Sequence, residues 1–146
     1  MDLGALYEEV ILDHNRSPRN WGEVEGATAR VQGTNPLCGD RLTLTLRLDD
    51  DVISDVRFTG EGCAISKASA SMMTQAVKGR TRREAEGIFE GFHQLVTGRG
   101  GATPDKSLGS LRAFAGVARF PTRVKCATMA WHALKEGLGR VNGGQG

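Results

Sequence analysis

The chain has 146 residues, of which 39% are hydrophobic and 25% are charged, a composition that suits one globular domain spanning 1–146. Its 19 Lys and Arg residues nearly balance 17 Asp and Glu residues, and the net charge of +2 argues against a nucleic-acid surface or a polybasic membrane anchor. Apolar runs are far shorter than the roughly 20 residues that cross a bilayer, and no signal-peptide core is evident, so we expect a cytoplasmic protein. Three cysteines fit metal-bound or reactive thiols better than a disulfide framework.

The first half of the chain predicts one helix and a small sheet. Apolar residues at three- and four-residue steps predict an amphipathic helix over 3–14. The segment 29–32 adds a short strand, and the strict apolar and polar alternation over 41–48 predicts a half-buried strand. Three aspartates then form a turn, and 52–59 returns as the partner strand of an antiparallel hairpin.

The second half of the chain predicts helices. An alanine- and serine-rich helix over 66–78 ends where Gly79 suits a left-handed cap. Thr81 and Glu84 form a capping-box pattern that opens a third helix, which runs to Gly98.

A glycine-rich loop at 98–105 separates that third helix from a short helix over 108–117. A final helix over about 123–138 precedes a frayed tail at 141–146. The predicted fold class is therefore α+β: a small antiparallel sheet of about three strands packed on one side by four to five helices.

Cys38 belongs to the turn-forming sequence NPLCGD at 35–40, directly before the strongest predicted strand. Gly39 allows the backbone to bend, so the thiol of Cys38 and the carboxylate of Asp40 can face the same point.

The other two cysteines are predicted at helix starts. Cys63 follows the hairpin and precedes the helix over 66–78, where free amide groups and the helix dipole favour a thiolate. Cys126 is expected in the first turn of the final helix, beside Arg123 and Lys125, which favour a thiolate for the same electrostatic reason.

Three thiolates and one carboxylate, from Cys38, Asp40, Cys63 and Cys126, make a ligand set that suits tetrahedral zinc or an iron–sulfur cluster. The opposing interpretation is that the cysteines are separate small buried residues, since no close Cys-x-x-Cys pair is present. The spacing alone leaves both interpretations open.

Histidine and tryptophan residues offer weaker candidates. His14, His93 and His132 all fall within predicted helices, where a structural role is the usual one, and His14 is the best ligand candidate because an aspartate and a loop adjoin it. Trp131 is expected in the core, whereas Trp21 suits the core or a partner contact.

Four segments resemble a known family. They are LYEEVILDHNRSPRN at 6–20, NPLCGD at 35–40, GEGCAIS at 60–66 and KCAT at 125–128. Over nearly its whole length the sequence resembles the U-type iron–sulfur cluster assembly proteins, the IscU/SufU family that includes the NifU N-terminal domain. The resemblance implies one shared metal site, formed by Cys38, Asp40, Cys63 and Cys126, at one exposed end of the fold.

Two features look like the SufU branch of that family. Lys125 replaces a histidine before the last cysteine, and 63 positions separate Cys63 from Cys126. FPTR at 120–123 stands where the scaffold branch carries a chaperone-recognition sequence, so dependence on such a chaperone is not expected.

The SufU branch implies a zinc site that accepts persulfide sulfur from a cysteine desulfurase. The scaffold branch implies a transient 2Fe–2S cluster on Cys38, Cys63 and Cys126 that is passed to apo-proteins.

We expect a sulfurtransferase-type carrier that acts with a cysteine desulfurase, rather than a stand-alone enzyme. Cys38 is the predicted sulfur acceptor because its glycine- and proline-flanked loop can swing, and Cys126 is the alternative acceptor.

Zinc is the expected cofactor, with iron or a transient 2Fe–2S cluster as the alternative. Other assembly proteins or apo-acceptors are further expected partners. Asp40 would remain as an oxygen ligand that loosens the site.

Two rival functions remain at this point. A zinc-stabilised binding module without sulfur transfer would use the same four ligands. A cysteine hydrolase that uses Cys126 and His132 is disfavoured, because residues six positions apart on one helix face different ways.

Overall fold

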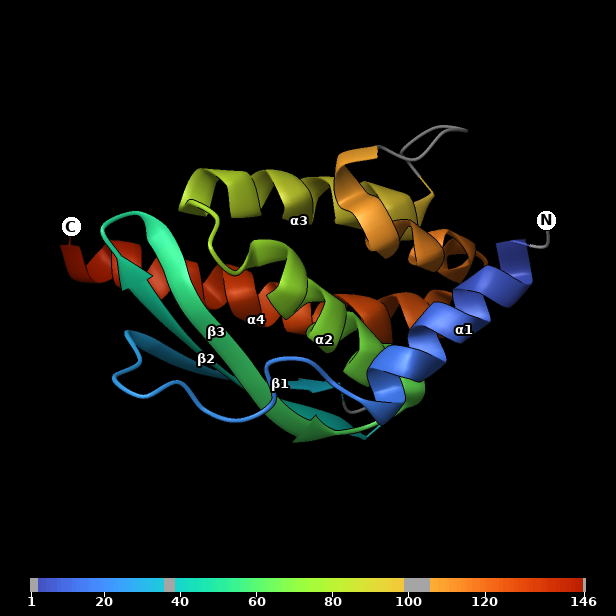
Figure 1. The fold of residues 1–146 in the computed structure, drawn as a ribbon, viewed down its shortest axis with the longest axis horizontal. Coiled ribbons are helices and arrows are strands. Elements are labelled where there is room, and N and C mark those ends of the chain that lie inside the picture. The colour runs from blue at the N-terminus through green and yellow to red at the C-terminus, as the bar shows by residue number, and fades with distance from the viewer. Residues whose placement is uncertain (1–2, 36–38, 99–105, 146) are drawn as a thin grey trace.

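The computed structural model describes residues 3–35, 39–98 and 106–145 (Figure 1). Cys38 and most of the glycine-rich loop lie outside the described residues. The described elements, in chain order, are α1 (Leu3–Arg16), β1 (Ala29–Asn35), β2 (Asp40–Asp49), β3 (Val52–Glu61), α2 (Ala64–Val77), α3 (Arg82–Thr97), the 3-10 element η1 (Lys106–Arg119) and α4 (Pro121–Gln145). No helix among these described residues combines the length and the apolar character that crossing a membrane requires.

The three strands form one antiparallel sheet in the order β1-β2-β3. The alternation predicted for β2 is confirmed for buried Leu42, Leu44 and Leu46 and for exposed Arg41 and Arg47. Thr45 departs from it, because it is buried and its hydroxyl accepts the backbone N–H of Val24. The sheet therefore has one apolar face and one largely polar face.

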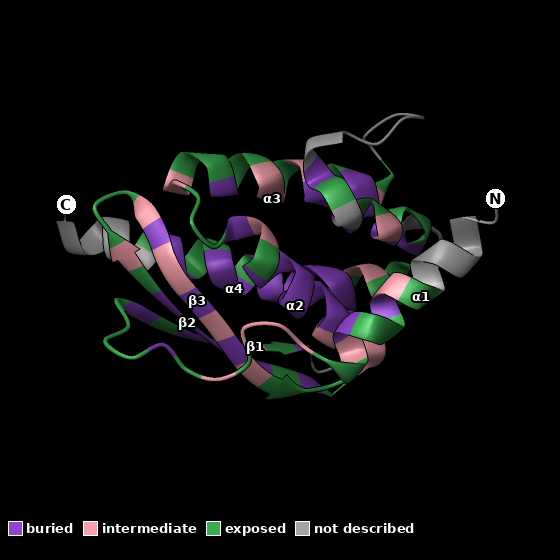
Figure 2. Ribbon diagram, in the orientation of Figure 1, coloured by how far each residue is buried: buried purple, intermediate pink, exposed green. Residues whose placement is uncertain are grey.

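The helices cover the apolar face of the sheet, as predicted for the α+β class (Figures 1 and 2). α4 packs on β1 and β2, α2 packs on β3, and α3 with η1 lies outside these two helices. Trp131 of α4 is fully buried and stacks on Phe92 of α3 with ring centroids 4.5 Å apart, which confirms its predicted core position. The other fully buried large side chains include Phe58, Phe114, Leu44, Leu46, Met72 and Met73.

The predicted helix signals of the central region are confirmed. Thr81 and Glu84 exchange both hydrogen bonds of a capping box, at 3.0 and 3.1 Å, and open α3. Gly98 ends α3 in the left-handed conformation at φ 76°, and Gly79 follows α2 at φ 83°.

Several element boundaries differ from the prediction: α1 runs to Arg16 and β1 to Asn35, two and three residues beyond their predicted ends. α2 begins at Ala64, two residues early, because Cys63 itself caps the helix. The predicted short helix is a 3-10 element, Lys106–Arg119, interrupted at Gly109, whose φ of 57° and ψ of −128° only glycine readily adopts. α4 begins at Pro121, where the proline ring suits a first helical position, and it continues beyond 138 to Gln145, into the segment predicted as a frayed tail.

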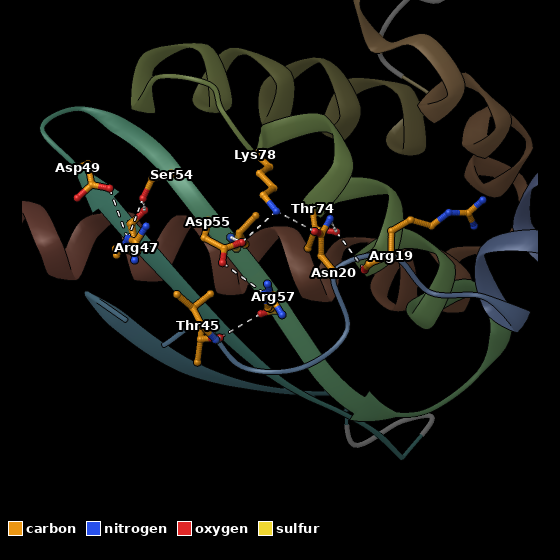
Figure 3. A network of polar contacts seen from close by, with 12 residues as sticks. Arg19, Asn20, Thr45, Arg47, Asp49, Ser54, Asp55, Arg57, Thr74 and Lys78 are labelled. Atoms are coloured by element: carbon orange, nitrogen blue, oxygen red, sulfur yellow. Dashed lines mark hydrogen bonds and ion pairs between the residues drawn. The ribbon is translucent and has the colours of Figure 1, made fainter. Parts of the chain in front are cut away.

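The segment before β1 covers the outer edge of β3 (Figure 3). Phe58 exchanges backbone hydrogen bonds of 3.0 and 2.9 Å with Asn20 and Gly22. The side chain of Asn20 donates to Thr74 Oγ1 of α2 at 3.1 Å, and so joins this cover to the helical layer. The Trp21 ring packs edge-on against Phe58 but stays 44% exposed, so it is not a core residue.

Candidate metal centre

Asp40, Cys63 and Cys126 meet at one end of the sheet. One ligand atom from each lies within 4.8 Å of the other two, and no other group of three or more such side chains occurs in the described part of the chain. Asp40 is the first residue of β2, Cys63 precedes α2, and Cys126 lies on α4. The fold thus joins three segments that are distant in sequence.

The carboxylate of Asp40 is held in place from two sides. Its Oδ1 accepts a hydrogen bond of 2.9 Å from the backbone N–H of Cys63, and the amide of Asn35 donates to Oδ2 at 3.4 Å. Asp40 is only 1% exposed. A Cβ on Gly62 would overlap Asp40 Oδ1 and would lie 2.8 Å from Ser66 Oγ, so the absence of a side chain at this position lets the carboxylate reach the Cys63 amide.

Cys63 is the N-cap of α2, which confirms its predicted place at a helix start. Its Sγ accepts a hydrogen bond of 3.5 Å from the backbone N–H of Ser66, and the Ser66 hydroxyl lies 3.8 Å from the same sulfur. The residue is half-buried.

The predicted place of Cys126 in the first helical turn is wrong. Because α4 begins at Pro121, Cys126 lies in the second turn, beyond the free amides of the helix end. It is 2% exposed, and Asn35 Nδ2 approaches its sulfur at 3.5 Å. Asn35 therefore contacts two members of the group, a role that the sequence analysis missed although this residue opens the NPLCGD motif.

Ser69 connects the two helices that carry the cysteines. Its hydroxyl donates to the carbonyl oxygen of Ala127 and accepts a 3.1 Å hydrogen bond from the indole N–H of Trp131. All three residues are fully buried, so these polar atoms satisfy one another inside the core. This contact fixes α2 against α4 one residue beyond Cys126.

The donor set fits a tetrahedral metal ion. Zinc bonds of about 2.3 Å to sulfur and about 2.1 Å to oxygen place neighbouring ligand atoms roughly 3.7 Å apart, a spacing near that of this group, whose atoms lie within 4.8 Å of one another. Among the residues that the structure describes, Asn35 alone donates to Asp40 Oδ2, over a long 3.4 Å contact, so this oxygen suits a ligand role. Two thiolates and a carboxylate suit zinc or an iron–sulfur cluster.

The histidines do not belong to this group. His14 is buried, its Nδ1 lies 2.7 Å from Ser71 Oγ, and burial lowers its pKa below the ordinary value. Partial burial, with His93 nearby, likewise lowers the pKa of His132. The surroundings of His14 are therefore structural, as expected from its helical position.

Comparison with known proteins identifies the family. The family model for the NifU-like N terminal domain matches residues 6–143. The zinc-dependent sulfurtransferase SufU of Bacillus subtilis is 45% identical over 145 residues, covering 98% of this chain and 96% of that protein. The iron–sulfur cluster assembly scaffold protein IscU of Streptococcus pyogenes is 46% identical over 138 residues, covering 94% and 86%.

A solved structure agrees with this assignment. The SufU of Fervidobacterium islandicum, described as a candidate iron–sulfur cluster assembly scaffold for the SUF system, superposes with a TM-score of 0.84 at 35% identity, covering 92% of this chain and 97% of that one. The chain belongs to the NifU-like N-terminal domain family, which includes the IscU and SufU iron–sulfur cluster assembly proteins.

Proposed function

We propose that this protein is a zinc-bound sulfur acceptor of iron–sulfur cluster biogenesis that takes persulfide sulfur from a cysteine desulfurase in the cytoplasm. The observation that carries the proposal is the meeting of Asp40, Cys63 and Cys126 within 4.8 Å. The 45% identity to a protein named as a zinc-dependent sulfurtransferase supports zinc and sulfur transfer.

The proposed ligands are Asp40, Cys63, Cys126 and Cys38, which stands two residues before Asp40 in the sequence. Bound zinc would keep the thiols deprotonated and connect the segments that carry them. Lys125, exposed beside Cys126, would offset part of the negative charge of the thiolates.

Cys38 is the proposed acceptor. Its thiolate attacks the outer sulfur of the desulfurase persulfide, so one S–S bond forms on Cys38 while the donor's S–S bond breaks and the donor cysteine leaves as a thiolate. This exchange needs no external oxidant or reductant. Cys126 is the poorer candidate because it is buried, and Cys63 is held by the Ser66 amide.

The test combines metal content with the location of the transferred sulfur. Anaerobically purified protein should contain one equivalent of zinc and should raise desulfurase turnover. After brief exposure to desulfurase and cysteine, peptide mass analysis should find the persulfide on Cys38. Cys63→Ala is the matched control for loss of a ligand: it should lose zinc affinity but still accept sulfur on Cys38. Persulfide formation on Cys126 at the parent rate in Cys38→Ala would contradict the assignment.

The second candidate function is a scaffold that assembles a 2Fe–2S cluster and passes it on. It is favoured by the 46% identity to a protein named as an IscU scaffold and by the sulfur-rich ligand set. In that case Asp40→Ala should lengthen the lifetime of a reconstituted cluster by removing a labile oxygen ligand. A lifetime equal to that of the parent, followed by visible absorbance, would count against the scaffold.

A further inference from the structure

A groove between β1 and α4 is not explained by the function proposed above. It encloses a volume of about 330 Å³ and is lined by residues 31–35 of β1 and by one face of α4 from Lys125 to Glu136. Its strand side and its helix side each span roughly 16 Å, because a strand rises about 3.3 Å per residue and a helix about 1.5 Å. The groove therefore runs along an edge of the sheet.

The two edges of the sheet differ in their backbone hydrogen bonding. The outer edge of β3 is covered: Phe58 bonds to the segment before β1, and Ile53 exchanges hydrogen bonds of 2.8 Å with Gly79 and Arg80. Within the described parts of the chain, residues 31–35 of β1 pair only with β2. Such an edge is a template to which a further strand can add.

α4 lies inward of this edge. A Cβ on Gly137 would lie 2.9 Å from Leu46 of β2 and 3.3 Å from Val31 of β1, so the helix passes over both strands. Met129 reaches further in, where it lines a small recess with Gly60 of β3. Paired strands lie about 4.8 Å apart and packed helices about 8–10 Å apart, so two strand edges can pair only if each helix is set back in this way.

The groove is complementary to itself under a twofold rotation. Its strand side is centred on Gly33, where a Cβ would lie 3.5 Å from Met129 Cγ and 3.7 Å from Ala133 Cβ, so Gly33 faces the middle of the helix side. A twofold axis beside Gly33 places Lys125 opposite the helix end that carries Glu136 of a second copy, and the reverse. Both side chains belong to exposed residues, so opposite charges meet at both ends of an apolar centre.

We propose that this groove joins two copies of the chain in an isologous dimer, in which β1 pairs antiparallel with β1 of the second copy across Gly33. The two three-stranded sheets then form one continuous sheet. Lys125 of each copy faces the partner's Glu136, so each partner brings a carboxylate next to the residue that precedes Cys126. Backbone pairing and the apolar centre provide the affinity, and the charged ends fix the register.

The first test is analytical ultracentrifugation of the zinc-loaded full chain from about 1 to about 200 μM, a range that detects Kd values typical of weak dimers. The protein should change from monomer to dimer with rising concentration. A monomer throughout this range would overturn the dimer. No desulfurase is present, so this outcome leaves the proposed sulfur transfer untouched.

Charge reversal locates the interface. Lys125→Glu and Glu136→Lys each place like charges at both ends of the groove, so each variant should dimerise at least tenfold more weakly than the parent. An equimolar mixture of the two variants should recover dimers, because every Lys then faces a Glu. Parent-like dimers of either variant alone, or no recovery in the mixture, would overturn the proposal.

Lys135→Glu is the matched control. It makes the same charge change on α4, but Lys135 lies on the side that faces α3, with its Nζ 5.5 Å from the Phe89 ring centroid. This variant should dimerise as the parent does, and a weakening equal to that of Glu136→Lys would overturn the proposal. Glu136→Lys also decides the matter if Lys125→Glu loses zinc, because Glu136 is ten positions from Cys126.

Amide hydrogen exchange, resolved by residue, tests the strand pairing itself. Concentrated protein should exchange more slowly than diluted protein at alternate amides within 31–35, because only every second N–H of a strand points to the new neighbour. A dimer that leaves these amides unprotected would be formed by another surface and would overturn the proposal.

Discussion

Gly62 determines how closely the Asp40 carboxylate approaches Cys63. A methyl group at Gly62 would overlap sterically with Asp40 Oδ1, which accepts the Cys63 N–H at 2.9 Å. Either the carboxylate or the 61–63 segment would then move. A ligand displaced by about 1 Å no longer fits a metal bond with its partners.

Gly62→Ala is therefore expected to lower zinc affinity at least tenfold, or by about 1.4 kcal/mol. Competition with a chromophoric zinc chelator measures this directly. Gly87→Ala adds the same methyl group on α3 in open space and should keep the parent affinity. Indistinguishable zinc affinities for the two variants would mean that Asp40 does not bind the metal through this arrangement.

Residue-level prediction from the sequence succeeded where a local signal exists. Cys63 was placed at a helix start because a hairpin ends before it and a helix follows it. Asn35 was missed because its role depends on the distance between β1 and α4, which no local pattern encodes. Cys126 was predicted in the wrong helical turn, because Pro121, the first residue of α4, was interpreted as lying before the helix.

At the scale of elements, α1 is joined to α2 through a buried histidine. His14 Nδ1 lies 2.7 Å from Ser71 Oγ, and the same hydroxyl accepts the backbone N–H of Arg19 at 2.8 Å. Burial and the charge of Arg19 lower the pKa of His14, and Asp13 opposes them. The folded protein therefore favours the neutral imidazole.

This pKa shift predicts a pH-dependent stability. The unfolded chain binds a proton at the ordinary histidine pKa, whereas the folded chain binds it only at lower pH, so stability is lost as the pH falls through that interval. Denaturant unfolding between about pH 7.5 and about pH 5.5 should show a smaller loss in His14→Asn, which keeps a polar group near Ser71 without titrating. Parallel pH profiles for the parent and His14→Asn would contradict the prediction.

Helices and strands were predicted correctly where neighbouring residues form a distinctive sequence pattern. The alternation of β2 and the capping box of α3 identify these elements because each rests on neighbouring residues. η1 was predicted as a shorter regular helix, since a left-handed Gly109 inside a 3-10 element leaves no distinct sequence pattern. The cover of the β3 edge by the segment before β1 is a tertiary property that no local pattern encodes.

For the whole molecule, the sequence predicts an α+β fold with helices on one sheet face because apolar periodicity determines which faces must be buried. The spacing of the three cysteines did not decide whether they are separate buried residues or members of one metal site. The meeting of Asp40, Cys63 and Cys126 depends on how β2, α2 and α4 pack, and at the sequence level it followed only from the family resemblance.

Bound zinc should stabilise the whole fold, because its proposed ligands come from the start of β2, the cap of α2 and the second turn of α4. A ligand that binds only the folded state at about 1,000 times its Kd adds roughly 4 kcal/mol. A strong chelator should therefore lower the Tm by on the order of 10 °C, as followed by calorimetry.

Two variants separate this metal effect from general destabilisation. Cys126→Ser should unfold near the temperature of the chelated parent and should lose its response to chelator, because the sulfur ligand is gone. His93→Ala, at a half-buried position outside the ligand group, should keep the full response. If chelator shifted the Tm of Cys126→Ser as far as that of the parent, the metal would be bound elsewhere. The three elements would then be held together by packing and by hydrogen bonds, such as those of Ser69 between α2 and α4 and of Asp40 with the Cys63 N–H.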